Sequence, residues 1–362
     1  MRFVSRKTGV AAAMLGISAI ALSACGQAPE EGTTNADNAD YTGCIVSDSG
    51  GFDDQSFNES SYRGLKAAET DLGISIAEAE SKSNADFATN LQGMMNAGCD
   101  LTVTIGFLLG DATKEAAEAN PDKNFAIVDF QYDEQIENVK PIIYDTAQAA
   151  FLAGYVAAAT SETGTVATFG GIKLPTVTIF MDGFADGVAK YNEDKGADVK
   201  LLGWDKDKQD GTFTGDFEKQ DKGKQVTKTF ISQGADVIMP VAGPVGKGAG
   251  AAVVEENAAG KSAKLVWVDS DGFETAPDYK DVMLTSVIKT MDTAVEEVIA
   301  GDVEENFDSS PYIGTLENGG VTIAPFHNFD SEVSDETKAE VEALKQAIIS
   351  GDLVIESSAS PK

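Results

Sequence analysis

Short apolar runs alternate with helix-like segments over most of this 362-residue chain, and this alternation restricts the fold more than any other feature. Such alternation indicates an α/β protein with parallel sheets, because parallel strands need a crossover connection that is usually a helix. The pattern predicts two doubly wound lobes of the same type. The predicted strands lie at 44–47, 74–77, 99–105, 124–129 and 141–144, and then at 165–169, 199–202, 236–239, 265–268 and 281–287.

The lobe boundaries follow from where the pattern restarts. A new series begins after Asp145, and a helix at 291–300 is predicted to return to the first lobe. We expect the chain to cross between lobes, and to hinge, near Asp145, Val287 and Tyr312. The segment 316–321 is predicted to be a hairpin turn. The expected division is 41–145 with 288–312 for the first lobe, and 146–287 with 313–362 for the second.

The first 24 residues resemble the signal peptide of a lipoprotein. Basic residues precede a short apolar run at 10–22, which is too short to span a bilayer as a permanent helix. Leu22-Ser-Ala-Cys25 resembles a lipobox, whose cysteine is joined to diacylglycerol and becomes the mature N-terminus. An ordinary cleaved signal is the alternative. Residues 25–40 are predicted to be a flexible tether, because no large apolar side chain follows Cys25 there. We therefore expect a lipid-anchored protein on the extracytoplasmic face of the cell membrane.

Composition excludes several classes of function. The formal net charge is −32, from 27 Lys and Arg against 59 Asp and Glu. Such a surface repels phosphates, so we expect no nucleic-acid partner and no binding to anionic headgroups. His327 is the single histidine, which leaves no Cys/His zinc cluster and no base for a serine or cysteine triad. We expect no metal, no cofactor and no enzymatic activity.

Two patterns that suggest an enzyme fail on spacing. Residues 243–248 look like a phosphate loop, but Val241 and Gly248 stand where a Walker motif needs a glycine and a Ser or Thr. We interpret this segment as a strand-to-helix turn that brings Gly243 to the ligand. The adjacent acids Asp53 and Asp54 suggest a glycosidase pair, but neighbouring loop residues rarely face one target.

The segment 47–58, Ser-Asp-Ser-Gly-Gly-Phe-Asp-Asp-Gln-Ser-Phe-Asn, is the strongest candidate for a binding loop. It follows an apolar strand and precedes a helix, which places it at the ligand edge of a parallel sheet. Its two glycines permit a tight turn. Asp48 offers an acceptor, Asn58 a donor and an acceptor, and Phe57 a stacking face. This combination suits a flat, polar ligand that carries hydroxyl groups.

Helix signals add two expectations. Ser56 and Glu59 have the spacing of a capping box, with Phe57 as the first helical residue. Phe180 and Phe184 recur at the spacing of a helix face that packs into the core.

The remaining cysteines, Cys44 and Cys99, each begin a predicted strand. In a flavodoxin-like strand order these two strands are neighbours, so a disulfide is plausible outside the cell. Two unrelated buried thiols are the alternative.

Several motifs together resemble the basic membrane protein (Bmp) family of lipoprotein solute receptors, which includes receptors for purine nucleosides. The resemblance covers residues 41 to about 300 and implies a type I periplasmic-binding-protein fold. The motifs are the loop 47–58, Gly106-Phe-Leu-Leu-Gly-Asp111, Phe151-Leu-Ala-Gly-Tyr155, Gln233-Gly-Ala-Asp236, Trp267-Val-Asp-Ser-Asp271 and Leu284-Thr-Ser-Val-Ile-Lys289.

The resemblance also implies roles for residues at the base end of the site. By motif, Phe57 stacks on the base, while Asp48 and Asn58 read its edge. A second stacking ring comes from the loop before the Gln-Gly-Ala-Asp helix. Phe217 matches it best, but the loop departs from the family pattern, so Phe213 remains an alternative.

At the sugar end, the family pattern matches Asp269 and Lys289, which would hold the ribose hydroxyls. Gly106, Phe107 and Asp129 lie at predicted strand ends and are further candidates for lining the cleft.

The sequence thus predicts a tethered, monomeric substrate-binding protein of an ABC importer. It would close two lobes on a nucleoside, most readily a purine, and deliver it to a permease and ATPase encoded elsewhere. A sugar or a flavin is the alternative ligand. A surface sensor or adhesin on the same fold is the alternative function.

Overall fold

The computed structural model describes residues 38–361. The predicted signal (1–24), the lipidation site Cys25 and the tether residues up to 37 lie outside the described residues. Within 38–361 no helix combines the length and the apolar character needed to cross a bilayer. The strands form two six-stranded sheets and one two-stranded sheet, which confirms the predicted α/β class.

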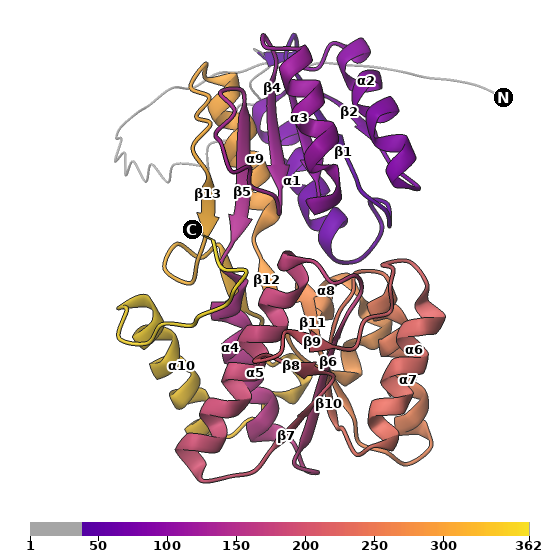
Figure 1. Ribbon diagram of the computed structural model, residues 1–362, viewed down its shortest axis with the longest axis vertical. Coiled ribbons are helices and arrows are strands. Elements are labelled where there is room, and N and C mark those ends of the chain that lie inside the picture. Colours follow the sequence, from indigo (N-terminus) through magenta and orange to yellow (C-terminus); the bar gives the residue numbers. More distant parts are fainter. Residues whose placement is uncertain (1–37, 362) are drawn as a thin grey trace, which may run out of the picture. The chain divides into compact units, whose positions relative to one another are not determined.

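The first sheet has the strand order β13-β5-β4-β3-β1-β2, and its neighbouring strands are all parallel. Figure 1 shows that its last strand and its helix α9, both orange, come from late in the chain and lie among indigo and magenta elements. The strands are β1 (Thr42–Val46), β2 (Ser75–Ala79), β3 (Leu101–Ile105), β4 (Asn124–Val128), β5 (Val139–Tyr144) and β13 (Tyr312–Gly314). The helices are α1 (Phe57–Leu72), α2 (Phe87–Ala97), α3 (Gly110–Ala119) and α9 (Met291–Val303).

The second sheet repeats this arrangement with the order β14-β12-β11-β10-β6-β7, except that β14 is antiparallel to β12. Its strands are β6 (Thr165–Gly170), β7 (Lys200–Leu202), β10 (Val237–Val241), β11 (Lys264–Asp269), β12 (Met283–Lys289) and β14 (Val321–Ile323). Its helices are α4 (Thr146–Thr160), α5 (Pro175–Lys195), α6 (Gln220–Ser232), α7 (Val245–Ala258), α8 (Gly272–Thr275) and α10 (Asp335–Ile349). The strands β8 (Trp204–Asp205) and β9 (Asp210–Gly211) form a separate two-stranded hairpin.

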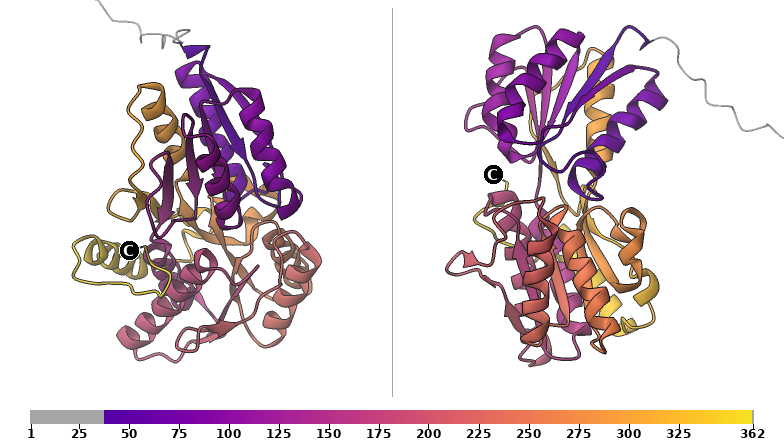
Figure 2. Two further views of the ribbon diagram at one scale, coloured as in Figure 1. Left: turned by 45° about the horizontal axis from the view of Figure 1, so that its top comes forward. Right: turned by 90° about the vertical axis from the view of Figure 1, so that its right-hand side faces the viewer.

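The chain passes between the sheets three times. It leaves β5 for α4 at Asp145 and leaves β12 for α9 at Thr290, where α9 packs against α1. It returns to the second sheet after Gly314, because β13 pairs with β5 through that residue. The predicted hairpin at 316–321 is wrong, since the strands that flank this turn belong to different sheets. Figure 2 shows the exchange of segments from two further sides.

Helix α4 is rich in small apolar residues because other elements cover it on several sides. Twelve of its 15 residues are buried, because it packs against α5 and also contacts β12, β14 and α10. A helix that is covered on several sides is apolar all round. Small residues bring the two helices close: a Cβ atom on Gly154 would overlap the backbone carbonyl of Phe184 in α5.

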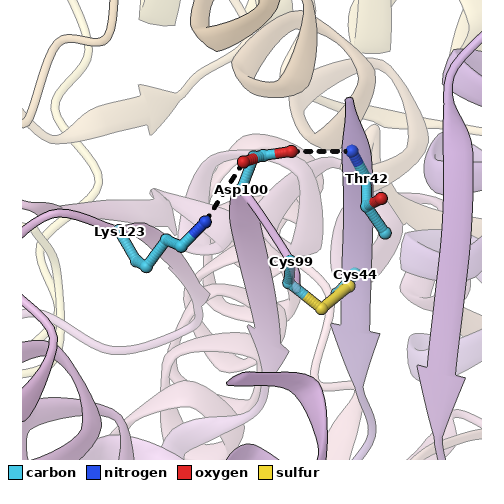
Figure 3. The surroundings of a disulfide bond; sticks show 5 residues. All are labelled: Thr42, Cys44, Cys99, Asp100 and Lys123. Carbon is cyan, nitrogen blue, oxygen red and sulfur yellow. Dashed lines mark hydrogen bonds and ion pairs between the residues drawn. A yellow bond between two sulfur atoms is a disulfide. The ribbon is translucent and has the colours of Figure 1, made fainter. Parts of the chain in front are cut away.

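A disulfide links the first sheet near the start of two parallel strands. Cys44 in β1 is bonded to Cys99, which stands just before β3, and their Cα atoms lie 5.9 Å apart (Figure 3). Asp100 braces the same end of the sheet: its carboxylate accepts from the backbone N–H of Thr42 at 2.9 Å and from the ammonium of Lys123 at 3.2 Å. The crosslink therefore joins segments that are separated by 55 positions in the chain.

Removal of this disulfide should destabilise the protein. For a loop of this length, the chain-entropy model assigns about 4 kcal/mol of unfolding free energy to the crosslink. We expect the Cys44→Ser/Cys99→Ser variant to melt at a lower temperature than the parent, as followed by circular dichroism. A reductant should lower the melting temperature of the parent toward that of the variant and leave the variant unchanged. Equal melting temperatures of parent and variant without reductant would contradict this assignment.

Candidate functional site

A cavity lies where the carboxyl ends of strands from both large sheets meet. It holds about 550 Å³ of empty space, including its open mouth, which falls within the range of small-molecule sites. Strand ends at such an edge are where open α/β sheets bind ligands. All ten residues that the sequence singled out for ligand binding line it, namely Asp48, Phe57, Asn58, Gly106, Phe107, Asp129, Phe217, Gly243, Asp269 and Lys289.

The helix that follows the binding loop begins with a different cap from the predicted one. Ser56 is the N-cap residue of α1, but its hydroxyl makes no cap bond and instead donates to the carboxylate of Asp269 at 2.9 Å. The cap is Asp54, whose carboxylate accepts from three backbone N–H groups at 2.9–3.0 Å, those of Ser56, Asn58 and Glu59. The predicted Ser56 cap is therefore wrong, because a distant partner takes its hydroxyl.

Asp48 and Asn58 form the polar end of the cavity. The Asn58 side chain donates from Nδ2 to Asp48 at 3.0 Å and to Asp54 at 3.2 Å. Gly106, with φ at 109°, lies against the other oxygen of Asp48, which a Cβ atom at this position would overlap. Glycine is therefore required there, both for this backbone conformation and for the close approach of the carboxyl group.

Of the four phenylalanines that line the cavity, Phe57 and Phe217 come from segments that belong to different sheets. Phe57 is in the first turn of α1, and Phe217 is in the loop before α6, with its ring against Gly171. The alternative ring, Phe213, lies outside the lining and packs edge-on against Trp204, with ring centroids 6.0 Å apart. Of the two candidates in this loop, Phe217 is thus the one that faces the cavity.

A buried lysine joins the two sheets. Lys289, at the end of β12, is 2% exposed, and its ammonium lies 2.6 Å from Asp129 and 3.2 Å from Asp269. The ammonium also lies 4.7 Å from the ring centroid of Phe57 and 5.3 Å from that of Phe180, within the range of cation–π attraction.

The two aspartates stand at equivalent places in the two sheets. Asp129 directly follows β4, and Asp269 ends β11, and each of these strands is the third from one edge in its sheet. Both residues have positive φ, 62° and 71°. A non-glycine residue in this conformation carries strain of order 1–3 kcal/mol, and such strain is concentrated at functional sites.

Several lining residues were not predicted. Asp54 was considered only as an enzyme acid, and Phe180 was assigned to the core. In the structure Phe180 is buried and also lines the cavity, beside Leu174, Thr176 and Val177 at the start of α5. A signal existed: the strand ending at Gly170 is followed by Pro175, so this helix start lies at the same sheet edge as the other candidates.

The binding loop also contacts the second sheet directly. The backbone carbonyl of Gln55 accepts from three donors, Trp267 Nε1 at 3.1 Å, Ser270 Oγ at 3.1 Å and Thr275 Oγ1 at 2.9 Å. The ammonium of Lys247 donates to the carbonyl of Asp53 at 3.0 Å. These bonds hold the loop of the first sheet against α7, α8 and the end of β11.

Burial shifts the ionisation of the acidic groups. Desolvation raises the pKa of Asp48 to about 8, although the bond from Asn58 opposes this shift. Desolvation also raises the pKa of Asp54 to about 6, against the effect of three backbone N–H groups. The pKa of Asp129 is raised by burial, with Lys289 opposing. Burial disfavours the ammonium of Lys289, but the nearby carboxylates outweigh it and raise the pKa of this lysine.

Comparison with known proteins shows the family to which the chain is similar. Residues 42–358 match the model of the family described as ABC transporter substrate-binding protein PnrA-like. The chain is 32% identical to the CD4+ T-cell-stimulating antigen of Listeria innocua, over 97% of this chain and 98% of the relative. It is 30% identical to the ABC transporter nucleoside-binding protein BmpA of Lactococcus lactis, over 97% and 99%.

A solved structure resembles this fold over most of its length. The solute-binding protein of an ABC transporter system from Aeropyrum pernix is 25% identical, with a TM-score of 0.79 over 87% of this chain and 94% of that chain. A second solute-binding protein of this kind, from Conexibacter woesei, has a TM-score of 0.68 at 20% identity, over 89% and 100%, and shares the fold.

The raised pKa of Asp48 predicts how stability depends on pH. A carboxyl group in the unfolded chain titrates near 4, whereas Asp48 in the folded protein titrates at about 8. Between these values the folded state holds a proton that the unfolded state has lost, so the free energy of unfolding falls as pH rises, by at most about 1.4 kcal/mol per pH unit from this group. Asp48→Asn removes this titration and keeps an acceptor for Asn58.

We therefore expect the melting temperature of Asp48→Asn, relative to the parent, to increase from pH 4 to pH 8 and then level off. Asp53→Asn, an exposed neighbour, is the control and should show no such trend. A difference between Asp48→Asn and the parent that stays constant across this range would contradict the assignment.

Proposed function

This chain belongs to the PnrA-like (Bmp) family of ABC transporter substrate-binding proteins, and we propose that its own ligand is a nucleoside, most readily a purine nucleoside. Proteins of this class are extracytoplasmic, bind a ligand and work with a permease and an ATPase. We further propose that Cys25 carries the lipid anchor and that the protein acts as a monomer. The two sheets with their helices would act as lobes, with boundaries close to those expected from the sequence.

The observation that carries the ligand assignment is the division of one cavity into an aromatic part and a charged part. Phe57 and Phe217 offer stacking faces for a flat base. Asp129, Lys289 and Asp269 offer acceptors and donors beside them, the groups that hydroxyls of a sugar require. A free sugar carries no flat aromatic base to stack on these rings, and a flavin is larger than a purine nucleoside.

The charge of the cavity favours a nucleoside over a nucleotide. Four carboxyl groups line it, those of Asp48, Asp54, Asp129 and Asp269, against the single ammonium of Lys289 among the lining residues. A phosphate would meet these carboxyl groups in a site of low dielectric constant, where repulsion is strong. The uncharged ribose of a nucleoside meets no such penalty.

Phe217→Leu should weaken nucleoside binding by one to two decades, since a lost stack removes roughly 1–3 kcal/mol. Phe213→Leu is the matched control, because its ring belongs to the same loop but lies outside the cavity. Isothermal titration with a panel of nucleosides measures both. Equal affinities of the two variants would show that Phe217 does not stack on the ligand, and mass spectrometry of molecules released from the purified protein would test the ligand class directly.

Closure should be visible through tryptophan fluorescence. The chain has two tryptophans, and Trp267 bonds to the loop carbonyl of Gln55 across the two sheets. In Trp204→Phe, ligand should change the emission of Trp267 as this bond forms or tightens. In Trp267→Phe, ligand should leave the emission of Trp204 unchanged, because this residue lies in β8 and its indole donates to Asp182 in α5, with no hydrogen bond to the first sheet within the described residues. No ligand-dependent change in Trp204→Phe, despite binding by calorimetry, would contradict closure at this contact.

A further inference from the structure

We propose that Asp54 is a positioning residue that fixes the side-chain amide of Asn58, so that the site selects bases with two adjacent N–H donors on one edge. Among the purine nucleosides, guanosine has this edge, from its N1–H and 2-amino groups. The inference rests on the proposed function, because it concerns the same cavity. It goes further because it names the base that the site prefers. It also names Asp54, which does not contact the base, as the residue that sets this preference.

The first step is the orientation of the amide. Nδ2 of Asn58 faces carboxylate oxygens of both Asp48 and Asp54, at 3.0 and 3.2 Å. The opposite orientation would place a carbonyl oxygen against the same two oxygens, which repel it. Both N–H donors of this side chain are therefore committed to the protein.

The second step is the acceptor that remains. Asn58 is 1% exposed, and across residues 38–361 no donor lies within hydrogen-bonding distance of its Oδ1 atom. A buried amide oxygen without a donor is costly, and such groups in native proteins call for a partner. Asn58 lines the cavity, so a ligand N–H is the partner that the geometry lacks.

The third step is what holds Asp54 in place. Its two oxygens accept from three backbone N–H groups in the first turn of α1, and Asp54 itself is 1% exposed. The carboxylate cannot turn away from Asn58 without uncapping the helix. The start of α1 thereby dictates which atom of Asn58 is available to a ligand.

The two residues then offer matching acceptors. Ionised Asp48 accepts from one N–H group, and Oδ1 of Asn58 accepts from another. Adenine presents a donor beside an acceptor on its Watson–Crick edge, and that acceptor would face a carboxylate wherever Asp48 is ionised, that is, above its pKa of about 8. One mismatched buried polar contact lowers affinity on the order of 10- to 100-fold.

Ionisation of Asp48 gives an independent readout. The carboxyl groups of Asp54, Asp129 and Asp269 face it and disfavour its charge, with the ammonium of Lys289 beyond the last two. Its raised pKa leaves it largely protonated at pH 7, so a base with two donors must displace that proton into solvent. Guanosine binding should therefore release a proton, and adenosine binding should not.

The test is calorimetric titration of the parent protein with guanosine, inosine and adenosine, in two buffers of different ionisation enthalpy. Above the pKa of Asp48, where its carboxylate is ionised, we expect guanosine to bind at least about tenfold tighter than adenosine, and at pH 7 we expect guanosine but not adenosine to release a proton on binding. Asp54→Asn frees the Asn58 amide to rotate and should reduce the guanosine-to-adenosine affinity ratio at least about fivefold. Asp53→Asn is the matched control, since its side chain does not line the cavity, and it should keep the ratio of the parent.

Asn58→Ala leaves the helix cap intact, so it tests the same base preference if Asp54→Asn does not fold. It should lower guanosine affinity more than adenosine affinity. Nucleosides that bind the parent with no preference for guanosine, or a ratio unchanged in the variants, would overturn the inference and leave the proposed function standing. A parent protein that binds none of the nucleosides would instead overturn the proposed function.

Discussion

The contact of Lys289 with Asp129 and Asp269 is the interaction on which the rest of the site depends. An ammonium that is 2% exposed is stable only when charges of opposite sign and good hydrogen-bond geometry replace water. The carboxylates that do so come from the ends of strands in two different sheets. The ammonium keeps both partners only while the edges of the two sheets face each other closely, and this facing creates the cavity.

The strained backbone at the two aspartates supports the same view. Asp129 and Asp269 adopt positive φ at matching strand ends, and a structure retains such strain only where its surroundings enforce it. Each aspartate adopts the left-handed conformation at the end of its strand, and the chain turns there, at the edge of the sheet that borders the cavity. The duplication of the sheet order thus places one acceptor on each side of a single ammonium, which neither sheet would hold alone.

The strand ends were predictable from sequence, whereas the partners that cross between the sheets were not. Parallel strands bring their carboxyl ends to one edge, so Gly106 and Asp129 were candidates for lining the cleft, and the family pattern added Asp269; all three line the cavity. The cap of α1 was not predictable, because the hydroxyl of Ser56 bonds to a carboxylate 213 positions away. The role of Phe180 was missed for a similar reason: a ring spaced for the core also lines a cavity once a second sheet lies opposite.

Asp54 shows why helix formation and recognition cannot be separated in this loop. A serine cap at Ser56 would have accepted from the backbone N–H of Asn58 or Glu59 and would have placed no carboxylate of Asp54 against the Asn58 amide. With Asp54 as the cap, one carboxylate both starts α1 and receives the amide of Asn58. Because the helix loses its cap if this carboxylate moves, its orientation is maintained by folding energy rather than by the ligand. The empty site is therefore already arranged for one pattern of donors, and little binding energy is lost to ordering these two side chains.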